Sequence, residues 1–155
     1  LSLTGGGLVG NGENGQIVNC YTTGSIAGQS YEKSGASGGG IVGQSGYYQS
    51  TVVKNSFTDC DMRLIGNKNT AQVYPVAKYT ENCYSSLGQK IFYNGEELIF
   101  ESLDIIDESN FKSPTYLKNR LKFGTYSDEE TLAADYTKAW LLQNDAFPKL
   151  YFESD

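Results

Sequence analysis

The sequence contains no histidine and only three cysteines in 155 residues. Without histidine it cannot form a Ser-His-Asp triad, a His-containing zinc site or the His-Glu-x-x-His helix of metallopeptidases. Cys20, Cys60 and Cys83 lack the Cys-x-x-Cys spacing of a metal cluster, and a nucleophilic cysteine would lack its histidine base. We therefore expect no catalytic residue, no cofactor and no bound metal.

Basic residues are few, and long apolar runs are missing. The chain has 12 Lys and Arg against 18 Asp and Glu, a net charge of −6, and the basic residues form no cluster. Nucleic acids and anionic membranes bind surfaces that are rich in Lys and Arg. A membrane-spanning helix needs about 20 consecutive apolar residues, and no run of the sequence approaches this length. We expect no nucleic-acid partner and no membrane span in this segment.

Glycine and tyrosine, by contrast, are abundant, with 18 and 12 residues. Gly-rich turns between strands that are rich in aromatic residues, Thr and Ser are typical of all-β arrays. The sequence begins at Leu1 without a Met or a signal peptide, and Leu1-Ser2-Leu3 already alternates. We interpret it as a segment of a longer polypeptide, taken from within an array.

One pattern occurs three times along the chain. The first copy is Gly6-Gly7-Leu8-Val9-Gly10 with Asn19-Cys20-Tyr21-Thr22, the second is Gly39-Gly40-Ile41-Val42-Gly43 with Asn55-Ser56-Phe57-Thr58, and a degenerate third copy ends in Asn82-Cys83-Tyr84-Ser85. The three asparagines lie 36 and 27 positions apart. Periods of about 20 to 50 residues are typical of solenoids, whose coils bury their apolar faces against one another. The repeat predicts about three stacked coils.

The second copy predicts which side chains face inward. From Thr58 to Leu64 the even positions are small or apolar and every odd position is charged, which is the alternation of a strand. Because Val53 should also face inward, the alternation must slip by one residue at Asn55, and asparagine tolerates the left-handed backbone conformation that such a slip needs. The same reasoning predicts a ladder of Asn19, Asn55 and Asn82 at one corner, with Cys20, Ser56 and Cys83 in an inner column that continues in the third copy through Ser85 and Leu87.

The same phase places Tyr21, Phe57 and Tyr84 on the outer face, one in each coil. Exposed, stacked aromatic rings can bind a sugar or a protein partner. The alternative is that they cover the sheet or are covered by the C-terminal segment. Lys54 and Glu81 lie at matching positions, and we expect them to pair across the ladder for less than about 1 kcal/mol.

The glycine pairs predict tight corners, where positive φ and close backbone approach are both possible. Residues 28–38 are rich in Ser and Gly and predict a surface loop, which is a second candidate for partner binding. Cys20 and Cys83 would be separated by a whole coil, about two strand spacings of ~4.8 Å, so we expect buried free thiols. Pro75, in the third copy, removes a hydrogen-bond donor and suggests that the array ends there.

The part that follows is of another kind, and we divide the chain into repeats over residues 1–88 and a C-terminal region over residues 89–155. Asn94-Gly95 between two apolar runs predicts a β-hairpin. Ser113-Pro114 predicts a short helix, and Ser127-Asp128-Glu129-Glu130 predicts a second one through a capping box. We expect this region to pack on the last coil as its cap, because a solenoid needs its terminal edge protected.

Two acidic groups could carry chemistry. Asp59 and Asp61 lie two apart on one strand face, and Asp104, Asp107 and Glu108 cluster after the hairpin. Paired carboxylates can hydrolyse glycosidic bonds, and carboxylate oxygens can bind calcium. Because Asp59 and Asp61 alternate with Cys60 and Met62, a solvated strand face explains them as well.

The repeated segment resembles a known family. Gly6-Gly7-Leu8-Val9-Gly10, followed by Ile17-Val18-Asn19-Cys20-Tyr21-Thr22-Thr23-Gly24, resembles the GLUG motif, a repeat of long bacterial surface and secreted proteins. These include adhesin-like proteins and the non-catalytic regions of immunoglobulin-A-cleaving metallopeptidases. The closing Trp140 with Asn144-Asp145-Ala146-Phe147-Pro148-Lys149-Leu150 looks like the ending that such arrays often have. The resemblance implies a parallel, right-handed β-solenoid at the cell surface or secreted.

We therefore expect a non-enzymatic structural and binding module that acts as a stalk or adhesion module. Its partners would be neighbouring repeats of the parent chain and a host or matrix protein or glycan. One alternative is a carbohydrate-binding module that uses Tyr21, Phe57 and Tyr84 as its stacking platform. Another is a fragment of a polysaccharide-cleaving β-helix enzyme that uses Asp59 and Asp61.

Overall fold

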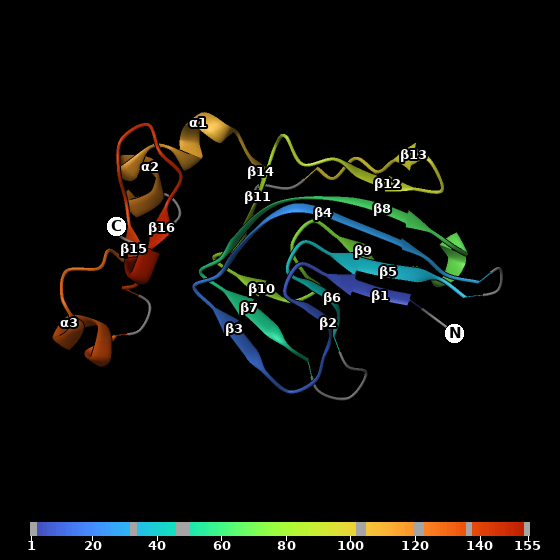
Figure 1. Ribbon diagram of the computed structural model, residues 1–155, viewed down its shortest axis with the longest axis horizontal. Helices are drawn as coiled ribbons and strands as arrows, with labels where there is room; N and C mark the ends of the chain where they lie inside the picture. Colours follow the sequence, from blue (N-terminus) through green and yellow to red (C-terminus); the bar gives the residue numbers. More distant parts are fainter. Residues whose placement is uncertain are drawn as a thin grey trace. The chain divides into compact units, whose positions relative to one another are not determined.

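The computed structural model describes residues 3–31, 34–45, 50–101, 105–119, 123–135 and 138–153. Most of the regular structure in these ranges is β-strand, so the chain is of the all-β class (Figure 1). It divides into two compact units, Leu1–Ile105 and Ile106–Asp155. The predicted boundary after residue 88 marks where the sequence repeats end, whereas these units are defined by packing. That boundary therefore stays a prediction.

In the first unit the strands come in three successive groups. The first group is β1 (Leu3–Gly6), β2 (Val9–Gly12), β3 (Gln16–Val18) and β4 (Tyr21–Gln29), the second is β5 (Ala36–Gly39), β6 (Val42–Ser45), β7 (Val52–Lys54) and β8 (Phe57–Ile65), and the third is β9 (Val73–Tyr74), β10 (Thr80–Glu81) and β11 (Tyr84–Ser86). A 3-10 turn, η1 (Lys68–Thr70), precedes the third group.

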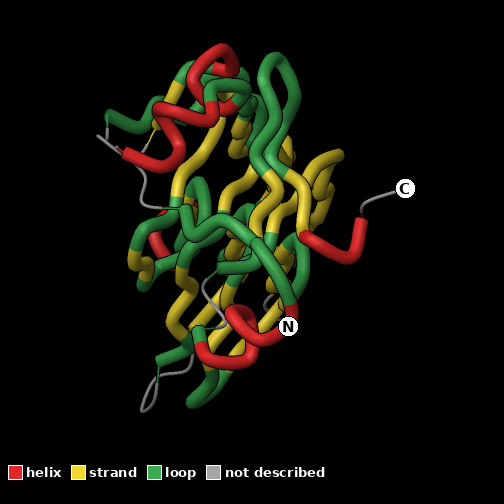
Figure 2. The backbone as a smooth tube through the Cα atoms, turned by 90° about the vertical axis from the view of Figure 1, so that its left-hand side faces the viewer, coloured by secondary structure: helices red, strands yellow, loops and turns green. Residues whose placement is uncertain are grey.

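Each strand pairs with its counterpart in the next group, and these pairs are parallel. The sheets have the orders β1-β5-β9, β2-β6 and β3-β7-β10, and β8 lies between β4 and β11. The strands run side by side in both views (Figures 1 and 2). The repeated residues are in register, with Tyr21 opposite Phe57 and Phe57 opposite Tyr84. Equivalent residues of the three copies therefore lie next to one another.

The change in repeat length has a local origin. Val9 is opposite Val42, an offset of 33, whereas Ile17 is opposite Val53, an offset of 36. The three additional residues of the second copy therefore lie between β6 and β7. Strand pairing on either side of this segment is preserved, because loops tolerate insertions better than strands do.

The asparagine corner has the predicted backbone conformation. Asn19, Asn55 and Asn82 have φ values of 53°, 48° and 50°. The Asn82 side-chain amide donates to Oδ1 of Asn55 at 3.2 Å. Backbone bonds tie the corners together, from the Asn19 N–H to the Lys54 carbonyl and from the Asn55 N–H to the Glu81 carbonyl. Lys54 and Glu81 form the expected ion pair at 2.8 Å.

Replacing Asn55 with Ala is expected to lower the free energy of unfolding by about 2 kcal/mol. Roughly 1 kcal/mol comes from forcing a Cβ-bearing residue without a local polar side chain into the left-handed region, and about 1 kcal/mol from the lost amide bond. Asn55→Gly should lose only about half as much, because glycine accepts positive φ. Urea denaturation of both variants measures the difference. If both variants lost the same unfolding free energy, the tolerance of asparagine for positive φ would not be what stabilises this corner.

The glycine pairs allow close backbone approach rather than positive φ. A Cβ on Gly7 would lie 2.1 Å from the Gly40 carbonyl oxygen, and one on Gly40 would lie 2.3 Å from the Pro75 carbonyl oxygen. Among the glycines described, positive φ occurs at Gly24 and Gly95 and not at these pairs. The expectation of positive φ at the pairs is therefore wrong. Stacking of one corner on the next leaves no room for a side chain there.

The core lies between the sheets, and the predicted alternation along β8 is confirmed. Thr58, Cys60, Met62 and Leu64 are all at most 2% exposed, whereas Arg63 and Ile65 are exposed. Other buried residues of this unit are Ile41, Val42, Val53 and Cys83. Two predictions fail. Leu87 is 63% exposed because β11 ends at Ser86. The described part of residues 28–38 is no surface loop, since it includes the end of β4 and most of β5, and Ser30 and Ala36 to Gly38 are buried.

The predicted hairpin is confirmed, and it also extends the largest sheet. β12 (Ile91–Tyr93) and β13 (Glu96–Glu97) pair antiparallel around Asn94-Gly95, both of which have positive φ. On its other side β12 pairs parallel with β8, with Tyr93 opposite Leu64. β11 and β12 thus lie along successive parts of β8, with a turn at residues 87–88 between them.

The second unit is small and contains the helices. They are α1 (Glu108–Phe111), α2 (Pro114–Asn119) and α3 (Glu129–Ala134), with a hairpin of β15 (Trp140–Leu141) and β16 (Lys149–Leu150), a 3-10 turn η2 (Tyr151–Glu153) and, at the junction of the units, β14 (Ile105–Ile106). Pro114 opens α2 as predicted, whereas α3 is capped by Asp128 rather than Ser127. Trp140, Phe111 and Leu117 are 0% exposed and form the unit's buried centre. No helix in the described ranges is long and apolar enough to cross a membrane.

Candidate functional site

The predicted aromatic strip exists as a ladder but not as an open surface. Tyr21 and Phe57 stack with ring centroids 5.3 Å apart and planes 8° apart. Phe57 is only 2% exposed and Tyr84 only 9%, while Tyr21 is half-buried. The expectation that these rings lie exposed on the outer face is therefore wrong for Phe57 and Tyr84. These rings therefore contribute to the stability of the fold. A stacked pair such as Tyr21 and Phe57 stabilises it by about 1 kcal/mol.

The inner column has a shared hydrogen-bonding role. The side chains of Cys20, Ser56 and Cys83 each donate to the carbonyl oxygen two residues earlier, at 3.3, 2.7 and 3.3 Å. The Cys20 N–H in turn donates to the Ser56 hydroxyl oxygen at 3.0 Å. A small side chain with one donor therefore satisfies the carbonyl that precedes each left-handed asparagine. This explains why Cys and Ser exchange at this position.

All three cysteines are free, as expected. Burial raises the pKa of the Cys20 thiol, and burial together with the Asp61 and Asp59 carboxylates raises the pKa of the Cys60 thiol. A raised pKa leaves less thiolate at a given pH, and the thiolate is the reactive species. The Cys20 and Cys60 thiols are therefore poor nucleophiles in the folded chain.

Alkylation of the folded chain with iodoacetamide at about pH 8 is expected to be at least roughly tenfold slower than alkylation of the urea-unfolded chain, because Cys60 and Cys83 are buried and the pKa values of the Cys20 and Cys60 thiols are raised. Mass spectrometry of the alkylated chain measures both rates. The unfolded chain, kept free of reductant, should take up one label at each of Cys20, Cys60 and Cys83. Equal rates in the two states, or an unlabelled pair after unfolding, would contradict this assignment.

Three of the five acidic candidates, Asp61, Asp107 and Glu108, are engaged in local structure. Asp61 accepts a bond from the Lys90 N–H at 2.7 Å, and Asp107 caps α1 by accepting from the Ser109 N–H at 2.8 Å. Hydrogen bonding by the Ser109 side chain, and then by its backbone N–H, lowers the pKa of Asp107. Glu108 pairs with Lys112 at 2.6 Å. Asp104 lies outside the described residues. Within the described ranges no group of three or more His, Cys, Asp or Glu side chains could hold a metal ion.

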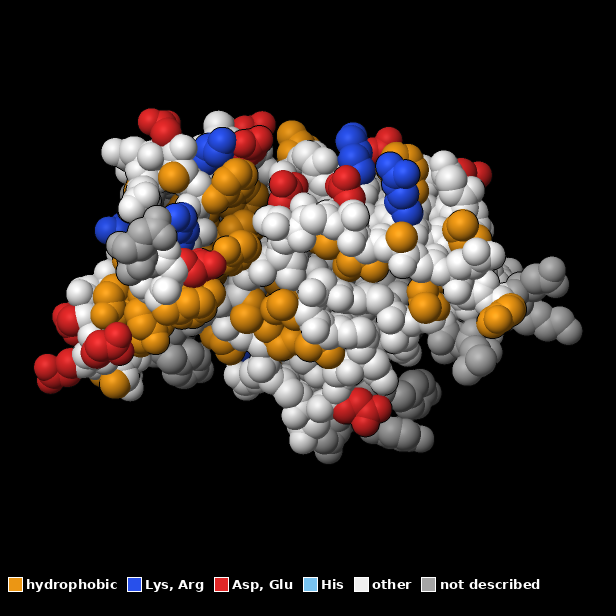
Figure 3. Space-filling view, viewed as in Figure 1, with side chains coloured by type: hydrophobic (Ala, Val, Ile, Leu, Met, Phe, Trp, Pro, Cys, Tyr) orange, Lys and Arg blue, Asp and Glu red, His pale blue; other side chains and the backbone are white. Residues whose placement is uncertain are grey.

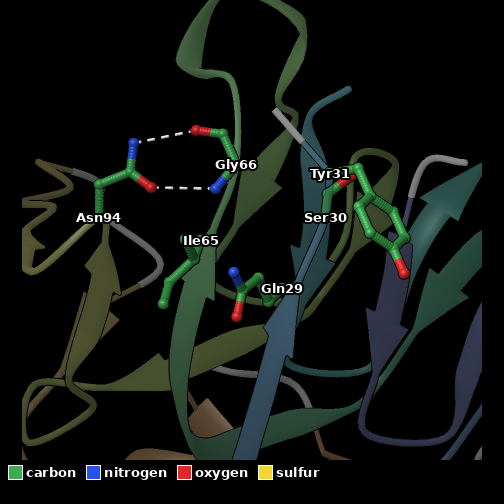
Figure 4. A pocket seen from close by; sticks show the side chains of 6 residues that line it. All are labelled: Gln29, Ser30, Tyr31, Ile65, Gly66 and Asn94. Atoms are coloured by element: carbon green, nitrogen blue, oxygen red, sulfur yellow. Dashed lines mark hydrogen bonds between the residues drawn. The ribbon is translucent and has the colours of Figure 1, made fainter. Parts of the chain in front are cut away.

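An open pocket lies where β4, β8 and β12 end. It encloses about 670 Å³ and is lined by Gln29, Ser30, Tyr31, Ile65, Gly66 and Asn94. Gln29 is opposite Ile65 in the parallel register, and Asn94 follows β12 beside them. Figure 4 shows Asn94 and Tyr31 on opposite sides, with Ile65 and Gln29 between them. The pocket thus joins three segments that are far apart in the sequence.

The pocket combines a fixed wall with exposed side chains. Asn94 accepts from the Gly66 N–H and donates to the Gly66 carbonyl oxygen, both at 2.9 Å (Figure 4). Tyr31 is 76% exposed and Ile65 is 49% exposed. The six described residues that line the pocket carry no charge. Sequence reasoning found only the segment that contains Tyr31, because no local pattern links Ile65 and Asn94 to it.

Comparisons with models of known families, with curated proteins and with solved structures find no match for this chain. The resemblance to the GLUG motif therefore stays a prediction. The function is inferred below from the structure of the chain itself.

Proposed function

We propose that the first unit is a right-handed parallel β-solenoid of about three coils, and that the chain is a non-enzymatic structural module of a bacterial surface or secreted protein, as the GLUG-like motif implies. The parallel, in-register pairing of the three strand groups supports the solenoid. The left-handed asparagines at matching corners support the equivalence of the coils. In such a module the coils give mechanical support and set the distance between neighbouring parts, and they contain no active site.

The observation that carries the proposal is that the apolar residues of the first coil are incompletely buried. Ala36, Val42, Val53 and Met62 of the second coil are at most 1% exposed, whereas their register partners Leu3, Val9, Ile17 and Ile26 are only half-buried. Among the described strands, β4 pairs with β8 alone. The first coil thus presents both an apolar end and a nine-residue strand edge.

This edge lacks the usual protection against pairing. Exposed edge strands commonly carry Lys, Pro or an inward-pointing charge. β4 contains no charged residue and no proline, and Glu13 is the one charged residue of the described range 3–31. Figure 3 agrees, with charged side chains of both signs over β12 and β13 and few over β1 and β2. Such an edge fits a further coil of the same kind, supplied by a neighbouring repeat.

A chain with residues 1–33 duplicated ahead of Leu1 tests the proposal, because 33 is the offset between the first two coils at β1 and β5. The added coil should protect the N–H groups of the original β4 that face away from β8, slowing their hydrogen exchange by roughly tenfold or more. A scrambled extension of the same composition is the control. Unchanged exchange in the duplicated chain, or equal protection by the scrambled one, would overturn the proposal.

The alternatives have less support. A carbohydrate platform on Tyr21, Phe57 and Tyr84 needs open ring faces, and two of the three rings are buried. A polysaccharide-cleaving enzyme would need Asp59 and Asp61 to face substrate together, but Asp61 holds the Lys90 N–H. Turnover of an acidic polysaccharide that is abolished by Asp59→Asn would revive the enzyme.

A further inference from the structure

We propose that the pocket of Gln29, Tyr31, Ile65 and Asn94 binds a neutral saccharide. The inference does not depend on the solenoid's function, because it rests on the pocket's own geometry. It also differs from the aromatic ladder, which lies at the other ends of β4 and β8. The pocket's volume of about 670 Å³ is within the range of about 300 to 1,000 Å³ that is usual for small-molecule sites.

The walls of the pocket are preorganised. Both ends of the Asn94 amide are bonded to the backbone of Gly66, which fixes the hairpin turn to the end of β8. The Ser30 N–H donates to the Ile65 carbonyl oxygen at 2.8 Å, which fixes the start of the Tyr31 segment to the same strand. A site whose backbone is already held loses less conformational entropy when a ligand binds.

The side chains of Tyr31 and Gln29 are available to contact a ligand in the pocket. The Tyr31 ring is 76% exposed, and neither it nor the Gln29 amide makes a side-chain hydrogen bond within the described part of the chain. A tyrosine ring offers a rigid apolar face at low entropic cost and a hydroxyl at its tip. An amide offers a donor and an acceptor, the two functions that a sugar hydroxyl needs. Ile65 adds an apolar contact between them.

The lining favours an uncharged sugar over other ligands. None of the described residues that line the pocket is charged, so these residues offer a polyanion no counter-charge. Arg63, a cation of the described part of β8, has its guanidinium 5.8 Å from the centre of the Phe92 ring and lines a separate cavity. A peptide that adds a strand needs a free edge, and β8 has none, because β4 and β12 pair with it on both sides; the free edge of β4 is the one assigned above to a further coil. A pyranose needs neither, since it presents an apolar C–H face and hydroxyls.

An array of neutral oligosaccharides (glucans, mannans, xylans and galactans), followed by calorimetry on the whole chain, tests the assignment. Tyr31→Ala should weaken binding by about tenfold or more, as truncation of a central aromatic contact does. Tyr31→Phe should retain most of the affinity because it keeps the ring. Gln29→Ala should weaken binding severalfold. Tyr31 and Gln29 are exposed, so the melting temperature of each variant should match that of the parent chain.

Phe152→Ala is the matched control, because Phe152 is 68% exposed and lies in the second unit. Binding of a neutral saccharide that is lost in Tyr31→Ala and kept in Phe152→Ala supports the site. Three results would overturn it: no binding to any neutral saccharide, binding to acidic glycans alone, or binding that ignores Tyr31 and Gln29. Capture of an uncharged peptide that depends on Tyr31 would also overturn it, in favour of a protein partner.

Discussion

Replacing Gly40 with Ala is expected to destabilise the chain by about 3 kcal/mol, the upper end of the usual cost of overpacking, or to prevent folding. The new Cβ would lie 2.3 Å from the Pro75 carbonyl oxygen and 2.5 Å from the Thr58 hydroxyl oxygen. Neither can withdraw easily. The Gly40 N–H itself donates to the Pro75 carbonyl at 3.0 Å, and the Thr58 hydroxyl bonds to that of Thr22 at 2.8 Å.

Gly15→Ala is the control for this change. Its Cβ would meet nothing closer than 3.7 Å, and Gly15 does not have positive φ. Urea denaturation should place Gly15→Ala within about 0.5 kcal/mol of the parent chain, as for most changes away from special positions. Similar stabilities for the two variants would mean that the corners are not stacked as closely as the structure has them.

Replacing Trp140 with Ala should cost about 3 to 5 kcal/mol in the second unit, the usual range for truncating a buried tryptophan. Trp140 is 0% exposed, and its ring stacks on Phe123 with centroids 5.0 Å apart. Its backbone also joins two segments, donating to Gly124 at 3.1 Å and accepting from the Tyr126 N–H at 2.9 Å. A cavity at this position therefore lies at the centre of the unit's contacts.

Hydrogen exchange read by mass spectrometry measures this effect without the lost tryptophan fluorescence. The amides of α2, β15 and β16 should lose protection in Trp140→Ala, while the exposed Phe152→Ala should leave them unchanged. Retained protection in Trp140→Ala would show that the second unit is held together by something other than this aromatic centre.

Much of the first unit could be predicted from local pattern. The spacing of Asn19, Asn55 and Asn82 predicts the equivalent corners, because the slip in alternation requires a residue that accepts positive φ. Asn94-Gly95 predicts the hairpin for the same local reason. These features depend on the backbone conformation of a few residues, and sequence reports such conformations well.

The burial of side chains and the composition of binding sites depend on segments that are distant in the sequence. Local sequence patterns predict both of these properties less well. Alternation assigns Phe57 to a face of its strand, but it does not say what covers that face, so the predicted exposure is wrong. Leu87 continues the alternation of its copy, yet the chain leaves the strand one residue earlier. The pocket needs the register of β4, β8 and β12 to bring Gln29, Ile65 and Asn94 together, and no motif encodes that register.

Stacking of the three coils is tested most directly by through-space NMR contacts in the isotope-labelled chain. Residues paired in a sheet lie about 4.8 Å apart across strands, close enough to give such contacts. The backbone protons of Phe57 should show contacts to both Tyr21 and Tyr84, with the N–H to Hα pattern of parallel strands. Strong Hα to Hα contacts between β4 and β8, the mark of antiparallel pairing, or no contact between Asn55 and Asn82, would contradict the stack.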